Sequence, residues 1–285
     1  MMKLIKGNIF TLLSTMKKLF ILLSLLALVV VGCGKKEEAK PVEDATSKVI
    51  KVGATPVPHS EILNAIKEDL AAKGYTLEIV EFTDYVTPNI ALNDGQIDAN
   101  FFQHVPYMES FAKDKGLKLV SAGKVHVEPL GLYSQKFKSV EELPEGATIA
   151  IPNDPSNGGR ALILLQSKGL IKLKADAGLD ATEADIAENP KKFVFKALEA
   201  AQLPRTLQDV DASIINGNYA LESKLNPVND SILLEGADSP YANIVTVVEG
   251  HENDEKIKVL IETLQSEKVK KFIAEKYNGG VVPAF

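Results

Sequence analysis

Asp98-Ala99-Asn100-Phe101-Phe102-Gln103-His104-Val105-Pro106-Tyr107 is the stretch that places this chain in the α/β class. We predict a strand over Ile97–Phe102, and Pro106 marks the start of a helix that ends near Gly116. A strand that runs directly into a helix is the repeating unit of α/β folds. The stretch also places aromatic side chains and a histidine at the end of the strand, where such folds bind ligands.

Two similar units precede this stretch. The sequence predicts strands over 49–53 and 76–82, and a helix over 61–73 that Ser60 caps and Gly74 ends. Pro88 opens a short helix over 89–93. The order β-α-β-α-β-α implies a mostly parallel sheet with helices on its faces.

The pattern restarts after an extended stretch over 117–133, which we interpret as a crossing into a second lobe. Strands are expected over 148–151, 193–198 and 212–215, with a helix over 161–167 and a helical segment from Pro204. A strand over 243–248 carries the chain back, and amphipathic helix follows over 255–277. We therefore predict lobe 1 over 49–128 plus 243–285, lobe 2 over 129–242, and a ligand cleft between the lobes.

The N-terminal residues differ in kind from the remainder of the chain. Residues 1–32 contain four lysines and no acidic residue, and an apolar run extends over 19–31. A basic segment before an apolar run is typical of a signal peptide, and the run is shorter than the ~20 residues that span a bilayer. Met1 and Met16 are alternative starts. Residues 33–48 are charged and lack aromatics, which predicts a flexible tether.

Cys33 is the only cysteine, so no intramolecular disulfide can form. It follows the apolar run directly, in a register that resembles the bacterial lipobox. We therefore predict a lipid anchor at Cys33 on the extracytoplasmic side of the cell membrane, with palmitate among its acyl chains. The alternative is a lone cysteine lost with an ordinary signal peptide.

Composition narrows the class of partner. The 285 residues are 45% hydrophobic and 25% charged, as in globular proteins. The formal net charge is −6, which argues against a nucleic-acid partner because phosphates would be repelled.

Several aromatic residues fall near predicted strand ends. Tyr85 follows the second strand, and Phe102, His104 and Tyr107 surround the end of the third. A single aromatic residue is more often part of a core. The cluster predicts an apolar pocket with polar tips.

The segment 152–160 is predicted to be a glycine-containing loop between a strand and a helix. Free N–H groups at that helix start would suit an anion, and Arg160, one of only two arginines, could bind a carboxylate in a bidentate manner. The alternative is a solvated Arg160. The segment lacks the Gly-Lys-Ser/Thr of a phosphate-binding loop.

Asn216 and Asn243 each sit at a predicted strand end, where asparagine offers both a donor and an acceptor to a zwitterion. Taken singly, each is more often a turn residue. The four histidines show no metal-ligand spacing, and no Gly-x-Ser-x-Gly elbow occurs. We therefore expect no catalytic residue, metal or cofactor.

Together these segments resemble the NlpA lipoprotein family, the methionine-binding receptors of bacterial ABC importers. The matching residues span nearly the whole mature chain: Asp84-Tyr85-Val86-x-Pro88-Asn89, Asp98-Ala99-Asn100-x-Phe102-Gln103-His104-x-Pro106-Tyr107, Pro152-Asn153-Asp154-Pro155-x-Asn157-x-Gly159-Arg160, Gln202-Leu203-Pro204-Arg205, Ile215-Asn216-x-x-Tyr219-Ala220, Ser239-Pro240-Tyr241-x-Asn243 and Asn278-Gly279-Gly280.

The resemblance implies a two-lobed, type II periplasmic-binding-protein fold that closes on methionine or a close analogue. It implies that Arg160 holds the substrate carboxylate and that Asn157, Asn216 and Asn243 belong to the polar end of the site. Phe101 departs from the family pattern; it either narrows the pocket or points into the core by strand alternation. The implied side-chain pocket is lined by Tyr85, Phe102, His104 and Tyr107.

The implied partners are the permease and ATPase subunits of an ABC importer and the membrane, with the receptor itself a monomer. The alternatives are the same fold with another amino acid or a methionine-containing dipeptide, a surface lipoprotein enzyme, and an adhesin or scaffold.

Overall fold

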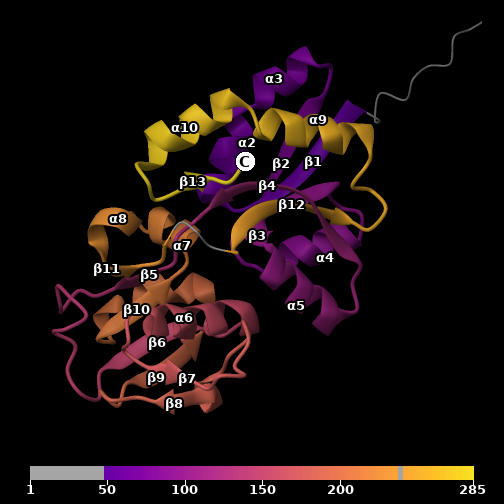
Figure 1. Cartoon of the computed structure of the whole chain (residues 1–285). Coiled ribbons are helices and arrows are strands. Elements are labelled where there is room, and N and C mark those ends of the chain that lie inside the picture. The colour runs from indigo at the N-terminus through magenta and orange to yellow at the C-terminus, as the bar shows by residue number, and fades with distance from the viewer. Residues whose placement is uncertain (1–47, 237–239) are drawn as a thin grey trace, which may run out of the picture. The chain divides into compact units, whose positions relative to one another are not determined.

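The computed structural model describes residues 48–236 and 240–285. The predicted signal peptide, Met16, Cys33 and residues 34–47 of the tether therefore lie outside the described residues. Residues 44–285 make up one structural unit, in which helices pack on two mixed sheets (Figure 1). The α/β prediction is confirmed. Within the described ranges no helix has the length and apolar character needed to cross a bilayer.

The first sheet has six strands in the order β13-β4-β12-β3-β1-β2. Strand β1 is parallel to β2 and β3, but β12 is antiparallel to β3 and β4, and β13 is antiparallel to β4. The predicted parallel arrangement holds for β1, β2 and β3, whereas the sheet as a whole is mixed, because the chain leaves it at the end of β4 and re-enters between β4 and β3, where β12 runs antiparallel to both. The strands are β1 (Val49–Ala54), β2 (Thr76–Glu81), β3 (Ala99–His104), β4 (Leu119–Val127), β12 (Ala242–Val248) and β13 (Val282–Pro283).

Helices cover both faces of this sheet. One face packs on α2 (Glu61–Ala65), α3 (Lys67–Ala72), α9 (Glu255–Leu264) and α10 (Glu267–Tyr277), and the other packs on α4 (Thr87–Asn93) and α5 (Val105–Lys115). The two cores alternate along β12, since Val245 and Val247 join the first and Ile244 joins the second. Strand alternation therefore sorts side chains between two apolar layers.

The single helix predicted over 61–73 is two helices that break at Ile66. Ser60 does not cap it: its backbone is already helical, with φ −62° and ψ −33°, and its side chain makes no cap hydrogen bond. A tight turn, η2 (Pro56–Ser60), precedes α2 and starts the coil earlier than the sequence indicated. The third strand ends two residues later than predicted, so that His104 is its last residue.

The second sheet has five strands in the order β11-β5-β10-β6-β9. Strand β6 is parallel to β9 and β10, and β5 is antiparallel to β10 and β11. A two-stranded ladder, β7 (Lys172–Leu173) with β8 (Ile186–Glu188), stands apart from it and is joined by the turn η3 (Glu183–Asp185). The strands of the second sheet are β5 (Gly131–Tyr133), β6 (Thr148–Pro152), β9 (Val194–Leu198), β10 (Ala212–Ile215) and β11 (Ser231–Leu234).

Helix α6 (Pro155–Ser167) packs on one face of the second sheet, and η4 (Ala200–Gln208) and α7 (Gly217–Glu222) pack on the other; α8 (Pro227–Asp230) precedes β11. The predicted loop over 152–160 is wrong, because α6 begins at Pro155 and Arg160 lies in its second turn. The segment η4 likewise begins four residues before Pro204. Gly158 and Gly159, which the sequence predicts to be loop residues, are helical.

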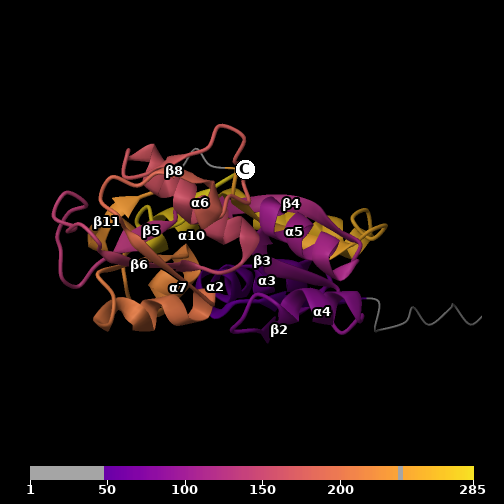
Figure 2. The same ribbon diagram turned by 90° about the horizontal axis from the view of Figure 1, so that it is seen from below.

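The chain passes between the sheets twice, at 128–130 and again between β11 and β12. Helices α5 and α6, which pack on different sheets, lie side by side (Figure 2). Each of these helices follows a strand that ends at the junction of the sheets. The division into lobes at 128/129 and 242/243 stays a prediction.

A substitution at Gly159 tests how closely α6 packs against residues 179–181. A Cβ atom at this position would lie 1.9 Å from the Leu179 carbonyl oxygen, whereas a Cβ at Gly178 would meet nothing within 4 Å. We expect Gly159→Ala to lower the free energy of unfolding by about 1–3 kcal/mol, because backbone must move to admit the methyl group. Urea unfolding followed by circular dichroism measures this. Gly178→Ala is the matched control, and equal stability of the two variants would contradict the close packing.

Candidate binding pocket

A narrow pocket lies at the junction of the two sheets, and side chains from both sheets line it. The structure brings all eight predicted substrate-binding residues into its lining, from five separate segments of the chain. Four further residues were not singled out by the sequence. The predicted residues are Tyr85, Phe102, His104, Tyr107, Asn157, Arg160, Asn216 and Asn243, and the additional ones are Gln103, Glu128, Gly217 and Asn218.

Arg160 is buried, with 3% of its surface exposed, so the solvated alternative does not hold. Its Nη2 donates to the Glu128 carbonyl oxygen at 2.9 Å, and Nε and Nη2 both donate to the Glu235 carboxylate, Nε at 3.0 Å. The guanidinium also lies over the Tyr241 ring, 4.3 Å from its centroid. Its Nη1 makes no hydrogen bond to any described residue and is left for a ligand.

The start of α6 is not a free anion site. Asp154 caps the helix and accepts from the Asn157 N–H at 2.9 Å, so the chain's own carboxylate fills the position predicted for a bound anion. The Asn157 amide group then donates to both Asp154 oxygens at 3.0 Å. Asn157 is therefore held rigidly, with its Oδ1 directed at other side chains.

Asn157 Oδ1 connects the two halves of the pocket. It accepts from Asn216 Nδ2 at 2.9 Å and lies 3.1 Å from Nε2 of His104, which comes from β3 of the other sheet. His104 Nδ1 accepts from the Tyr107 N–H at 3.2 Å, so the ring proton resides on Nε2 and is donated to Asn157. Burial, followed by the Arg160 charge, lowers the pKa of His104 to about 3, and the ring stays neutral.

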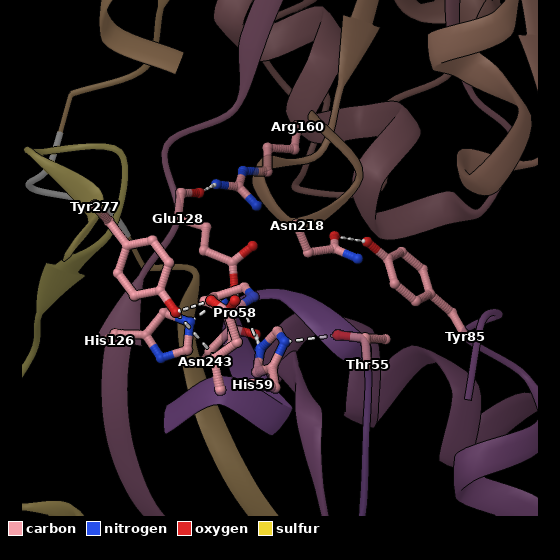
Figure 3. Close-up of polar contacts among 11 residues, drawn as sticks. Thr55, Pro58, His59, Tyr85, His126, Glu128, Arg160, Asn218, Asn243 and Tyr277 are labelled. Carbon is pink, nitrogen blue, oxygen red and sulfur yellow. Dashed lines mark hydrogen bonds and ion pairs between the residues drawn. The ribbon is translucent and has the colours of Figure 1, made fainter. Parts of the chain in front are cut away.

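Two amide groups in the lining have buried polar atoms without a hydrogen-bond partner among the described residues. These atoms are Asn216 Oδ1, an acceptor, and Asn218 Nδ2, a donor. The other ends of both amides are engaged: Asn216 Nδ2 with Asn157, and Asn218 Oδ1 with the Tyr85 hydroxyl (Figure 3). Because an unpaired buried polar atom costs free energy, these two atoms mark where a ligand's polar groups would bind.

Glu128 is the functional candidate that sequence reasoning missed. It lies in the first crossing between the sheets and is 5% exposed, and burial raises the pKa of its carboxyl group. Its Oε1 accepts from His126 Nε2 at 2.7 Å and lies 3.2 Å from His59 Nε2 (Figure 3). Gly217 permits the approach, since a Cβ there would lie 2.7 Å from the Glu128 Cβ.

The imidazole rings of His59 and His126 lie next to the Glu128 carboxyl group. Burial lowers the pKa of His59 to about 4 and that of His126 to about 3. His59 Nδ1 lies 2.7 Å from Thr55 Oγ1 and its Nε2 lies 3.1 Å from Asn243 Oδ1, so Nε2 carries the proton. The ligand atoms of His59, His126 and Glu128 fall within 4.8 Å of one another, which would permit a metal ion. In the observed arrangement His126 Nε2 donates to Glu128 Oε1 and His59 Nε2 donates to Asn243 Oδ1, so both of these nitrogens carry protons and do not present lone pairs to an ion.

Aromatic rings close the opposite side of the pocket. Tyr85 lies 5.9 Å from Phe102, 5.7 Å from Tyr107 and 5.0 Å from Tyr219 by ring centroids. The Tyr107 hydroxyl donates to the Tyr85 carbonyl oxygen at 2.8 Å, which fixes the rings relative to each other. Phe101 is fully buried in the core behind β3, so strand alternation removes it from the pocket.

The pocket therefore has a cationic end at Arg160, an anionic end at Glu128, and an aromatic wall. Among the residues that line it there is no serine, cysteine or lysine. The arrangement matches a zwitterion that carries an apolar side chain, because each charge would meet its opposite out of water.

Two α/β lobes joined by two crossings, with a pocket at their junction, define the class of two-lobed periplasmic-binding-protein folds. Residues 50–285 match the sequence profile described as NlpA lipoprotein, and the chain belongs to that family. The resemblance seen in the sequence is confirmed.

Known relatives agree with this assignment. A protein of Bacillus subtilis (strain 168) named methionine-binding lipoprotein MetQ is 44% identical over 275 residues, which cover 94% of this chain and 99% of the relative. A protein of Vibrio cholerae named probable D-methionine-binding lipoprotein MetQ is 44% identical over 257 residues, covering 90% and 93%. The solved structure of a nutrient-binding protein from Burkholderia cenocepacia bound to methionine is 49% identical, has a TM-score of 0.81, and covers 83% of this chain and 100% of that one.

The buried histidines make stability depend on pH. In the unfolded chain a histidine titrates near 6.5, while in the fold His104 titrates at about 3. The unfolded state therefore takes up a proton first as the pH falls below 6.5, and stability is lost towards the folded pKa. As the pH falls from 6.5 to 4, we expect the free energy of unfolding to decrease more steeply in the wild type than in His104→Asn. The difference between the two slopes should be about 1 kcal/mol per pH unit.

Asparagine at 104 retains a helix-capping acceptor but does not titrate. Urea unfolding at several pH values gives the two slopes, and the comparison cancels Glu128 and Asp154, whose raised carboxyl pKa values act in the opposite sense. Parallel curves for the wild type and His104→Asn would rule out a neutral, buried His104.

Proposed function

We propose that this protein is the receptor of an ABC importer that binds methionine outside the cytoplasm and delivers it to a membrane permease. The observation that carries the proposal is a pocket in which the Arg160 guanidinium and the Glu128 carboxyl group lie on one side and aromatic rings close the opposite side. The names of the relatives, which refer to methionine, support the same ligand.

The polar end of the solute would use the unpaired atoms of the pocket. Its carboxylate would bind Arg160 Nη1 and the donor Asn218 Nδ2, and its ammonium group would meet Glu128 and the acceptor Asn216 Oδ1. Of the residues predicted from the sequence, Arg160 and Asn216 keep direct roles. Asn157 acts by holding Asn216 and His104, and Asn243 lies at the same end through its bond to His59.

The side chain of the solute would lie against Tyr85, Phe102 and Tyr107, with His104 at its edge. A thioether suits this wall because sulfur–aromatic contacts contribute about 0.3–1.5 kcal/mol each. Contacts from both sheets would then favour the closed arrangement by their differential binding free energy.

We place the receptor on the extracytoplasmic face of the membrane, anchored through a lipid on Cys33. The permease and ATPase would be separate subunits, the ATPase supplying hydrolysis, and the receptor would act as a monomer without a cofactor. An enzyme or an adhesin on this fold is the alternative class, and a dipeptide or another amino acid is the alternative ligand. Mass spectrometry of the solute that co-purifies with the native protein separates the ligands, and turnover in a substrate screen would favour the enzyme.

Arg160→Ala tests the carboxylate end. We expect isothermal titration calorimetry with L-methionine to show binding by the wild type and a loss of at least about a hundredfold in Arg160→Ala, because a buried charge-assisted contact is removed. Arg205→Ala, at the only other and exposed arginine, is the matched control. Circular dichroism checks that the variants fold, and unchanged affinity in a folded Arg160→Ala would refute the role.

Glu128→Gln tests the ammonium end. Glutamine keeps the shape and accepts from the same histidines but has no charge, so we expect L-methionine to bind about tenfold or more weakly. 4-(Methylthio)butanoate, which lacks the amino group, should bind the wild type and Glu128→Gln with the same affinity. Glu262→Gln, at an exposed position, is the control. An equal loss for both compounds would assign Glu128 a structural role instead.

A further inference from the structure

The Arg160 guanidinium contacts both of the chain segments that join the two sheets. The first crossing contributes the Glu128 carbonyl oxygen, which accepts from Nη2 at 2.9 Å. The second crossing contributes the Glu235 carboxylate and the Tyr241 ring, on either side of residues 237–239. The guanidinium itself comes from α6 of the second sheet, so one side chain meets three parts of the chain at the junction.

Glu235 also ties the two crossings to each other. Its backbone N–H donates to the Leu130 carbonyl oxygen at 2.9 Å, and the Leu130 N–H donates to Glu235 Oε2 at 3.2 Å. The same Oε2 accepts from Arg160 Nη2, while Oε1 accepts from Nε at 3.0 Å. The Glu235 side chain is 15% exposed, so these bonds lie mostly out of water.

These contacts occupy one edge of the guanidinium and leave the other open. A guanidinium carries five N–H donors in a rigid plane. The Nε donor and both Nη2 donors are engaged by Glu235 and Glu128, whereas Nη1 bonds to none of the described residues. Because the group is planar, holding the Nε–Nη2 edge fixes the direction of Nη1.

We propose that Glu235 is a positioning residue for ligand recognition: it holds the Nε–Nη2 edge of Arg160 so that Nη1 faces the solute's carboxylate, and it does so from the second crossing. This inference rests on the proposed function, since it concerns how that function's carboxylate contact is oriented. Neutralising part of the Arg160 charge weakens the raw Coulomb attraction for the solute. The gain is that a long, flexible side chain is already ordered when the ligand arrives, which lowers the entropy cost of binding.

Because Glu235 lies in the second crossing, the contact between Arg160 and the solute's carboxylate depends on how the two lobes are joined and not on one lobe alone. Any shift of the second crossing relative to the first would move the Glu235 carboxylate and with it the direction of Nη1. Ligand affinity and the geometry of the crossings are therefore coupled through this ion pair.

Calorimetry with two ligands on the mature protein tests the inference. The ligands are L-methionine and L-methioninol, in which a hydroxymethyl group replaces the carboxylate. Glu235→Gln loses the charge and presents an amide donor to Nη2, so we expect L-methionine to bind about tenfold to a hundredfold more weakly. The affinity for L-methioninol should be lower than that for L-methionine in the wild type and unchanged by the substitution. Glu249→Gln, at an exposed position, is the matched control and should bind both ligands as the wild type does.

Three results would overturn the inference. Equal affinity of Glu235→Gln and the wild type for L-methionine means that Glu235 does not position Arg160. Tighter binding by Glu235→Gln means that its carboxylate competes with the solute. An equal loss for both ligands, with a lowered melting temperature, means a general structural role. If the wild type binds no amino acid at all, the proposed function fails instead, so the two failures are distinguishable.

Discussion

The burial of opposite charges at the junction of two sheets is the constraint on which the rest of the structure depends. Arg160 and Glu128 are 3% and 5% exposed, and a buried charge is tolerated only when it is paired and hydrogen-bonded. Arg160 is compensated by Glu235 and by the Glu128 carbonyl oxygen. Glu128 accepts a hydrogen bond from the neutral imidazole of His126, and the neutral His59 ring lies 3.2 Å away, so neither ring brings a charge of its own. The resulting pocket holds positive and negative groups in fixed positions, which suits a dipolar ligand.

The same junction explains how the two lobes communicate. Among the residues that the structure describes, three side-chain hydrogen bonds join the halves: His104 Nε2 to Asn157 Oδ1 at 3.1 Å, the Tyr85 hydroxyl to Asn218, and the Tyr219 hydroxyl to the Thr83 carbonyl oxygen at 3.2 Å. Each joins an element of the first sheet to one of the second. A solute that contacts both halves would add to these bonds and shift the equilibrium towards the closed arrangement.

The sequence predicted the elements that local patterning controls. The strands at 49–53, 148–151 and 212–215 and the helix stops at Gly74 and Gly169 appear as expected, because apolar runs and glycine act over a few residues. The errors arise where long-range pairing decides. The 152–160 segment is helical because Asp154 caps it and its glycines permit contact with residues 179–181, although glycine and proline alone indicate a loop. The first sheet is mixed because β12 re-enters between β4 and β3 and runs antiparallel to both, which no local pattern records.

The sequence by itself determined the α/β class, since strands alternate with helices along the chain, and its residues together with the family resemblance identified eight of the twelve residues that line the pocket. Only the tertiary structure decided what surrounds them. Glu128, His59, His126, Asn218 and Glu235 have no distinguishing spacing, and apart from the neighbours His126 and Glu128 they come from segments far apart in the chain. Their roles arise from burial, which alters the pKa of a carboxyl or imidazole group and makes each unpaired polar atom costly, and burial is a property of the folded chain alone.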